Sequence, residues 1–94
     1  MTIIQPSIIL TMLLASGIHT AAHAHGDFTC KVPVAEWQYK EALEDKLKKE
    51  GWDVRRIKID KGCYEVYGFD GKGARKEAYF NPKTFEFVGE VPQQ

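Results

Sequence analysis

The segment Gln38–Glu50 has apolar side chains at the spacing of an amphipathic helix. They recur every three or four residues, at Tyr39, Ala42, Leu43 and Leu47. On a helix, this spacing would place them on one stripe. The opposite face is charged, and Glu44 precedes Lys48 in the i,i+4 order that favours a helix. Gly51 follows, where a left-handed residue commonly ends a helix. We therefore predict a helix over Gln38–Glu50, with Trp37 packing just before it at the edge of the core.

After Gly51 the pattern changes to that of short strands separated by tight turns. β-Branched and aromatic residues, which strands favour, are concentrated there. Asp70–Gly73 is a strong hairpin signal because its glycines accept positive φ. Asn81–Thr84 has proline at the second position of a turn. These signals predict three to four antiparallel strands, drawn from Trp52–Asp60, Cys63–Phe69, Arg75–Phe80 and a short edge segment, Phe85–Val91.

Alternation along the central hairpin divides its side chains between two faces. One face would carry Tyr64, Val66, Ala78 and Phe80, and we expect this smoother face to meet the helix. The other face would carry Glu65, Tyr67, Phe69, Arg75, Glu77 and Tyr79. Val54 is out of phase with Ile57 and Ile59, which a bulge near Arg55–Arg56 would explain. The predicted fold class is α+β, with one N-terminal helix packed on a three- to four-stranded antiparallel sheet.

The N-terminal segment is apolar and lacks charged side chains. The chain has 94 residues, and all 13 Lys and Arg and all 13 Asp and Glu lie from Asp27 onward. The run Ile8–Leu14 is as long as a signal-peptide core and too short for a bilayer span, which takes about 20 residues. Ala22 and Ala24 form the small-x-small pattern that signal peptidase reads. Residues 1–24 are therefore interpreted as a secretory signal peptide. This predicts a periplasmic or secreted protein with no membrane span in its mature part.

The cleavage point and one alternative to cleavage stay open. Met1–Gln5 has no Lys or Arg, so an uncleaved N-terminal anchor or a buried apolar strand is the competing interpretation. Cleavage could follow either Ala24 or Ala22. The mature chain would then consist of an extended lead-in at 25–36, a domain at 37–91 and a tail at 92–94.

The charged residues of the mature part balance to a net charge of zero. No basic face dominates that could neutralise a series of phosphates, so nucleic acid is not an expected partner. The same balance argues against binding to an acidic membrane surface.

Two cysteines, Cys30 and Cys63, lie in the mature part. Export leads to an oxidising compartment, so an internal Cys30–Cys63 disulfide is the predicted state. Closing that loop would stabilise the domain by roughly 3–4 kcal/mol in the chain-entropy model. Two free thiols or an intermolecular bridge are the alternatives.

Four segments of the chain, taken in order, resemble the PepSY domain. They are Gly51–Val54, Gly62–Tyr67, Asp70–Gly73 and Glu77–Thr84. The resemblance covers about Trp37–Val88 and is closest to the short stand-alone periplasmic members of that superfamily. Its more specific parts are Gly62–Val66 and the turn Asn81–Thr84. It implies a module built from a helix and an antiparallel sheet.

The resemblance also implies a class of function. PepSY domains occur in propeptides of secreted metallopeptidases and in extracytoplasmic proteins, where they are proposed to restrain peptidases or bind partners near the cell envelope. It therefore implies a non-enzymatic binding module with a protein partner. It transfers no catalytic residue and no cofactor. Because no protease domain is attached to this chain, we expect regulation or inhibition of a peptidase in trans.

The residues themselves offer little for catalysis. The mature part contains no Ser, and its only His is His25. Ser–His and Cys–His chemistry are therefore disfavoured. Glu65 and Glu77 could in principle act as an acid–base pair, but charges on a solvated strand face explain them more simply. We expect no enzymatic activity.

The histidines near the cleavage site suggest an alternative function. If cleavage follows Ala24, His25 begins the mature chain, and its amine and imidazole could chelate copper(II). If cleavage follows Ala22, His25 becomes the third residue, which allows a planar copper site. Chance placement in a floppy tail is the simpler interpretation. A periplasmic copper-binding protein is therefore the second hypothesis.

The sheet face turned away from the helix is the first candidate for partner binding. Tyr67, Phe69 and Tyr79 lie on it, with Arg75 at its edge. Aromatic side chains with a polar rim are typical of an interface. Alternatively, the lead-in Phe28–Val34 could fold over this face, drawn there by the disulfide. The sequence alone leaves both possibilities standing.

Overall fold

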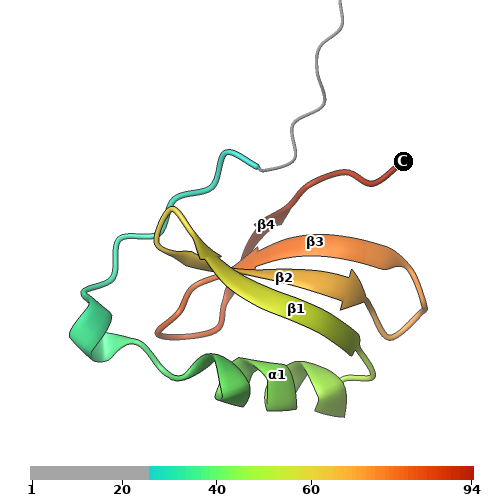
Figure 1. The fold of residues 1–94 in the computed structure, drawn as a ribbon, viewed down its shortest axis with the longest axis horizontal. Helices are drawn as coiled ribbons and strands as arrows, with labels where there is room; N and C mark the ends of the chain where they lie inside the picture. Colours follow the sequence, from blue (N-terminus) through green and yellow to red (C-terminus); the bar gives the residue numbers. More distant parts are fainter. Residues whose placement is uncertain (1–25) are drawn as a thin grey trace, which may run out of the picture.

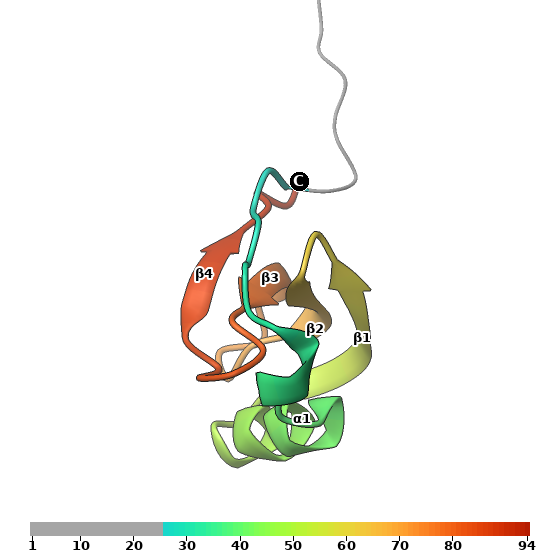
Figure 2. The ribbon, with the colours of Figure 1, turned by 90° about the vertical axis from the view of Figure 1, so that its left-hand side faces the viewer.

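In the computed structural model, which describes residues 26–94, one α-helix is followed by a four-stranded sheet (Figure 1). The strands lie in chain order, and each is antiparallel to the next. The helix α1 lies beneath one face of the sheet (Figures 1 and 2). The predicted α+β class is confirmed, and the sheet has four strands where three to four were predicted. The elements are a 3-10 turn at Val34–Glu36, α1 at Lys40–Lys49, β1 at Asp53–Asp60, β2 at Cys63–Phe69, β3 at Arg75–Phe80 and β4 at Phe87–Glu90.

The helix is shorter than its apolar spacing predicted. It begins at Lys40, and Tyr39 is an N-cap residue with extended backbone. Tyr39 is therefore off the helical stripe and 83% exposed, and Ala42 is exposed as well. The buried stripe consists of Leu43 and Leu47. Gly51 follows the helix with φ of 91°, as predicted for a left-handed end residue.

The register of the central hairpin agrees with the predicted faces. Tyr64 pairs with Phe80 and Val66 with Ala78, and these four side chains pack on Leu43 and Leu47 in one core. The predicted bulge in β1 is present between Val54 and Arg56, and it restores the phase of the strand.

Two predictions at the edges of the core have different outcomes. Trp37 packs against the core as expected, with its ring 5.5 Å from that of Tyr64 and its indole N–H donating to the Val32 carbonyl. The last strand begins later than predicted. Phe85 has φ of 64° and is buried at the end of a turn, so β4 starts at Phe87.

The lead-in is joined to the sheet through the β1–β2 turn. Cys30 and Cys63 form a disulfide with 5.0 Å between their Cα atoms, which confirms the predicted pairing. The Cys30 N–H also donates to the Lys61 carbonyl over 2.9 Å. Gly62 has φ of 82°, and a Cβ there would collide with the Cys30 carbonyl. A glycine is required at this position for both reasons.

The two ends of the described chain lie at the same end of the domain, away from α1 (Figures 1 and 2). Gly26 packs close to the Val91 side chain. Within residues 26–94, no helix has the length and apolar character that a membrane crossing requires.

Candidate protein-binding groove on the outer face of the sheet

The outer face is the side of the sheet turned away from α1. Its central side chains come from alternate positions of β2 and β3, and each cross-strand pair joins a Tyr to a Glu. Glu65 is opposite Tyr79, and Tyr67 is opposite Glu77. The first pair lies in what we call the covered half of the face, next to the disulfide. The second lies in the open half, next to the β2–β3 turn.

In the covered half, the lead-in packs directly on Tyr79. The Phe28 ring lies 5.0 Å from the Tyr79 ring, and the Gly26 N–H donates to the Tyr79 hydroxyl over 3.2 Å. That hydroxyl donates to Asp60 over 2.7 Å. Burial, followed by this hydrogen bond, raises the pKa of Tyr79. Tyr79 has 0% of its surface exposed, so it must be removed from the predicted partner-binding residues.

A glycine makes this close cover possible. Gly89 of β4 is opposite Tyr79, and a Cβ at that position would collide with the Phe28 ring. The alternative that the lead-in folds over the outer face is therefore correct for the half that contains Cys63 and Tyr79. The other half lies outside this cover.

The open half contains a groove of about 370 Å³. Tyr67 and Phe69 are half-buried in it, and Arg75 is exposed. The structure thus brings together three of the four predicted partner-binding residues. Their role in binding stays a prediction. The groove is lined by Arg55, Tyr67, Phe69, Arg75, Glu77 and Gln93, among others.

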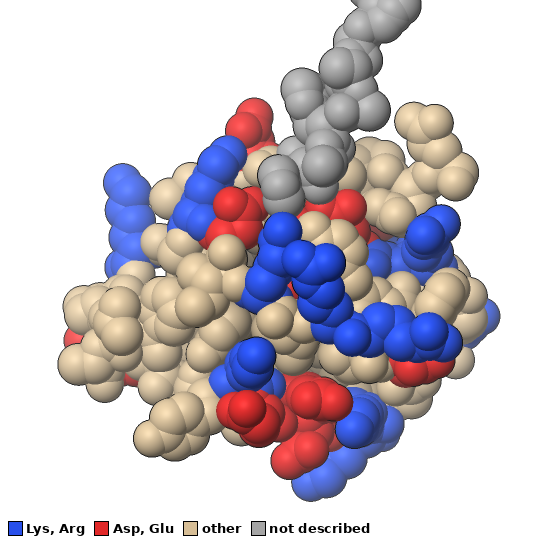
Figure 3. All heavy atoms as spheres, viewed as in Figure 1, with Lys and Arg blue, Asp and Glu red and all other residues tan. Residues whose placement is uncertain are grey.

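Strand β1 adds basic side chains that the sequence reasoning missed. The Arg55 guanidinium lies 5.3 Å from the centre of the Phe69 ring. Arg56 and Lys58 lie 5.4 Å and 5.7 Å from the centre of the Tyr67 ring. Figure 3 shows the side of the molecule with β1 nearest, where Lys and Arg side chains run as a band from the centre toward the right-hand edge. The sequence signal for these cations was the basic run beside the bulge. Only the β1–β2 register shows that they lie next to the aromatic rings of β2.

Two carboxyl groups on the outer face are buried. Glu65 is 0% exposed and Glu77 is 7% exposed, so the expectation of a solvated strand face was wrong. The Tyr67 hydroxyl donates to Glu65 over 2.7 Å. Burial raises the pKa of Glu77, and the neighbouring Glu65 raises it further. This pair belongs to the packing of the sheet, and residues 26–94 contain no Ser or His to act with it.

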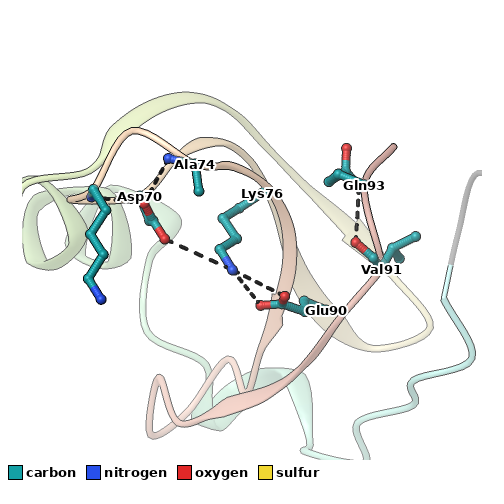
Figure 4. Close-up of polar contacts among 7 residues, drawn as sticks. Asp70, Ala74, Lys76, Glu90, Val91 and Gln93 are labelled. Atoms are coloured by element: carbon teal, nitrogen blue, oxygen red, sulfur yellow. Dashed lines mark hydrogen bonds and ion pairs between the residues drawn. The ribbon is translucent and has the colours of Figure 1, made fainter.

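Lys76 points to the other side of β3 from Arg75 and Glu77. It bridges both carboxylate oxygens of Glu90 at 3.1 Å and reaches Asp70 at 3.9 Å (Figure 4). Asp70 also accepts the backbone N–H groups of Lys72 and Ala74. These contacts order the turn at the open end of the groove. They also neutralise Lys76, so its charge is not offered to a ligand.

The copper alternative concerns residues that lie outside those described, namely His23 and His25. Within the described part of the chain, no three His, Cys, Asp or Glu side chains are grouped to hold a metal ion. No observation on residues 26–94 therefore bears on the N-terminal copper hypothesis.

The comparison with protein families gives one result for this chain. The family model described as peptidase propeptide and YPEB domain, a PepSY model, matches residues 7–91. The match includes the stretch 37–88, which carries the resemblance seen in the sequence, and extends further toward the N-terminus. Comparisons with curated proteins and with solved structures found no match. Since the family model covers most of the chain, this protein belongs to the PepSY family.

Proposed function

We propose that this protein is a non-enzymatic binding module that regulates or inhibits an extracytoplasmic peptidase in trans, through the open half of its outer face. The observation that supports the proposal most directly is the groove at Tyr67, Phe69 and Arg75. PepSY domains are propeptide-type modules that are generally non-catalytic and typically extracellular or periplasmic. In this proposal, the groove is the binding surface of the module.

The composition of the groove suits a protein partner. Aromatic residues and Arg are enriched at protein interfaces, where they provide much of the binding energy. Here Tyr67 and Phe69 form the floor. The hydrogen bond from Tyr67 to Glu65 and the guanidinium groups over both rings hold them in place before a partner arrives. Rings that are already ordered lose less conformational entropy on binding.

Export through residues 1–24 is part of the proposal. The disulfide observed between Cys30 and Cys63 is the form expected in an oxidising compartment. N-terminal sequencing of the protein recovered from the periplasm or medium tests this directly. A mature chain that begins at His23 or His25 is expected, and an intact Met1 in exported material would contradict it.

The function is tested with the oxidised mature protein as bait and as inhibitor. We expect it to capture an extracytoplasmic peptidase and to inhibit that enzyme when the two are mixed. Phe69→Ala should weaken inhibition by about tenfold or more, as is typical of a central interface aromatic. The matched control is Phe87→Ala, because Phe87 is 54% exposed on β4 and is not among the groove residues.

Three results would count against the proposal. The first is failure to inhibit any member of a broad panel of secreted metallopeptidases, together with failure to capture a peptidase. The second is equal loss of inhibition in Phe69→Ala and Phe87→Ala. The third is inhibition that the Phe69→Ala change leaves intact, which would place the contact elsewhere on the molecule.

A further inference from the structure

The groove in the open half has basic side chains on two sides of an aromatic floor. Arg55 and Arg75 line the groove from β1 and β3, and Arg75 is opposite Phe69. Arg56 and Lys58 of β1 stand beside the groove, over the Tyr67 ring. β1 is an edge strand, so its basic side chains lie along the edge of the sheet. Figure 3 shows how the Lys and Arg side chains of this side gather into a band.

Several cations near the groove already have partners. Arg55 forms a two-bond ion pair with Asp53, at 2.9 Å and 3.0 Å. Lys76 is held by Glu90 and Asp70. By contrast, within residues 26–94 no ion pair is formed by Arg56, Lys58 or Arg75. These three cations are therefore the ones that the open half offers.

The acidic side chains of this region are either buried or already paired with a cation. Glu65 and Glu77 are buried, with Glu77 in the lining of the groove, and the Tyr67 hydroxyl donates to Glu65. Asp53 is held by Arg55, and Glu90 by Lys76. A ligand in the groove would therefore meet aromatic faces and cations first. The overall net charge of zero conceals this local arrangement.

We infer that the groove binds an extended acidic segment of the partner protein, with carboxylates directed at Arg56 and Lys58 on one side and at Arg75 on the other. An apolar side chain of the same segment would lie over Tyr67 and Phe69. The inference rests on the proposed function, since it names the chemistry of the partner at that site.

The charge and geometry favour a peptide carboxylate over a single metabolite anion. The guanidinium of Arg is a planar fork that receives both oxygens of a carboxylate. Arg56 also lies against a ring, which keeps its side chain ordered before binding. Cations on both sides of a floor of two rings match a strand-like segment that carries several acidic residues.

The test uses the oxidised mature protein and labelled model peptides. The probe is a short peptide of alternating Glu and Phe, compared with peptides in which Gln or Lys replaces Glu. A thymidine oligonucleotide serves as a further arm, because a basic groove with aromatic rings also suits a single-stranded nucleic acid. Fluorescence anisotropy gives the affinities at two salt concentrations, and amide chemical shifts locate the contact.

We expect the Glu peptide to bind more tightly than the others, with an affinity that falls as salt is raised. Shifts should concentrate at Tyr67–Phe69 and near Arg75. The double change Arg56→Gln/Arg75→Gln should weaken binding by about tenfold. Lys40→Gln/Lys49→Gln is the matched control, because it removes the same charge from α1, and it should change affinity by less than about twofold.

The inference is overturned if the Gln peptide binds as well as the Glu peptide, or if the oligonucleotide binds more tightly than both. Equal effects of the two double variants would also overturn it.

Failure of this inference can be separated from failure of the proposed function. A captured peptidase that the groove variant still inhibits would leave the function standing without acidic selectivity. If the Glu peptide binds but no peptidase is captured, the acidic-segment site stands and the peptidase role fails.

Discussion

The covered and open halves of the outer face are built from the same strands and the same residue types. Each has one Tyr opposite one Glu across β2 and β3. In the covered half, Phe28 lies on Tyr79 and excludes solvent. In the open half, Tyr67 is instead approached by Arg56 and Lys58 and remains half-buried. The comparison shows that the lead-in, and not the strand sequence, decides which part of the face is core and which is surface.

The cover depends on contacts from outside the sheet. The Cys30–Cys63 bridge brings the lead-in to the β1–β2 turn. The absence of a side chain at Gly89 leaves space for Phe28. Breaking these contacts should make the covered half resemble the open one.

The largest effect is expected from removal of the disulfide. Because the bridge closes a loop with a sequence separation of 33, its loss should lower the free energy of unfolding by about 3–4 kcal/mol in the chain-entropy model. Urea unfolding of Cys30→Ala/Cys63→Ala against the wild type measures this loss. Reduced wild-type protein is the control and should behave like the double variant. An unchanged unfolding midpoint would mean that the other lead-in contacts hold the cover alone.

Removal of the Phe28 ring should have a smaller effect on stability. Phe28→Ala takes away the apolar cover of Tyr79 and is expected to cost about 2 kcal/mol. It should also make Tyr79 accessible to a tyrosine-modifying reagent, which mass spectrometry detects. Phe87→Ala is the control, because Phe87 is 54% exposed. Equal costs for the two variants, with Tyr79 still protected, would contradict the role given to Phe28.

The pair of buried carboxyls should appear in the pH dependence of stability. The pKa of Glu77 lies above its ordinary value of 4.5, so the folded state keeps a proton that the unfolded state releases. The contribution of Glu77 to stability is therefore present below pH 4.5 and is lost as pH rises through the raised pKa. Glu77→Gln should remove this loss. The free energy of unfolding of the variant should therefore rise relative to that of the wild type as pH rises.

The pKa of Asp70 is shifted in the opposite direction, so its effect on stability must be separated from that of Glu77. The backbone N–H groups of Ala74 and Lys72 hold the pKa of Asp70 below its ordinary value of 3.8. Its contribution is present above that pH and is lost on further acidification. The difference between wild type and Glu77→Gln cancels this shared effect. Parallel stability profiles for the two proteins across pH 4 to 8 would refute the raised pKa of Glu77.

The smallest effect on stability is expected at the rim of the open half. Arg75 is exposed and forms no ion pair within residues 26–94, so Arg75→Ala should change the free energy of unfolding by less than about 0.5 kcal/mol. Urea unfolding checks this value. A clear loss of stability would show that Arg75 supports the fold, and the contrast between the two halves would then be weaker than described.

Much of the fold follows from local patterns. The turn at Asp70–Gly73 and the alternation of the hairpin determine which residues pair, so both faces of β2 and β3 were predicted. The bulge in β1 was predicted because Val54 is out of phase with Ile57. These features depend on neighbours in sequence or on one tight turn.

Features that depend on distant segments were predicted less well. Alternation places Glu65 and Glu77 on the outer face, but it does not show that neighbouring rings and the lead-in bury them. Tyr39 fits a helical stripe, yet its backbone is extended, because the helix starts at Lys40, two residues after the predicted start at Gln38. Only the β1–β2 register places Arg56 and Lys58 beside Tyr67. The groove therefore emerges from tertiary packing.

The position of the two chain ends gives the domain a further property. Gly26 and the C-terminal segment leave the fold at the same end, while α1 lies at the other end (Figure 1). A domain whose ends lie close together can be inserted into a loop of a host protein with little disturbance to either partner. The fold of residues 26–94 is therefore suited to insertion between two segments of a longer chain, or to attachment at a single end. In each setting, the attachment is confined to one end of the fold.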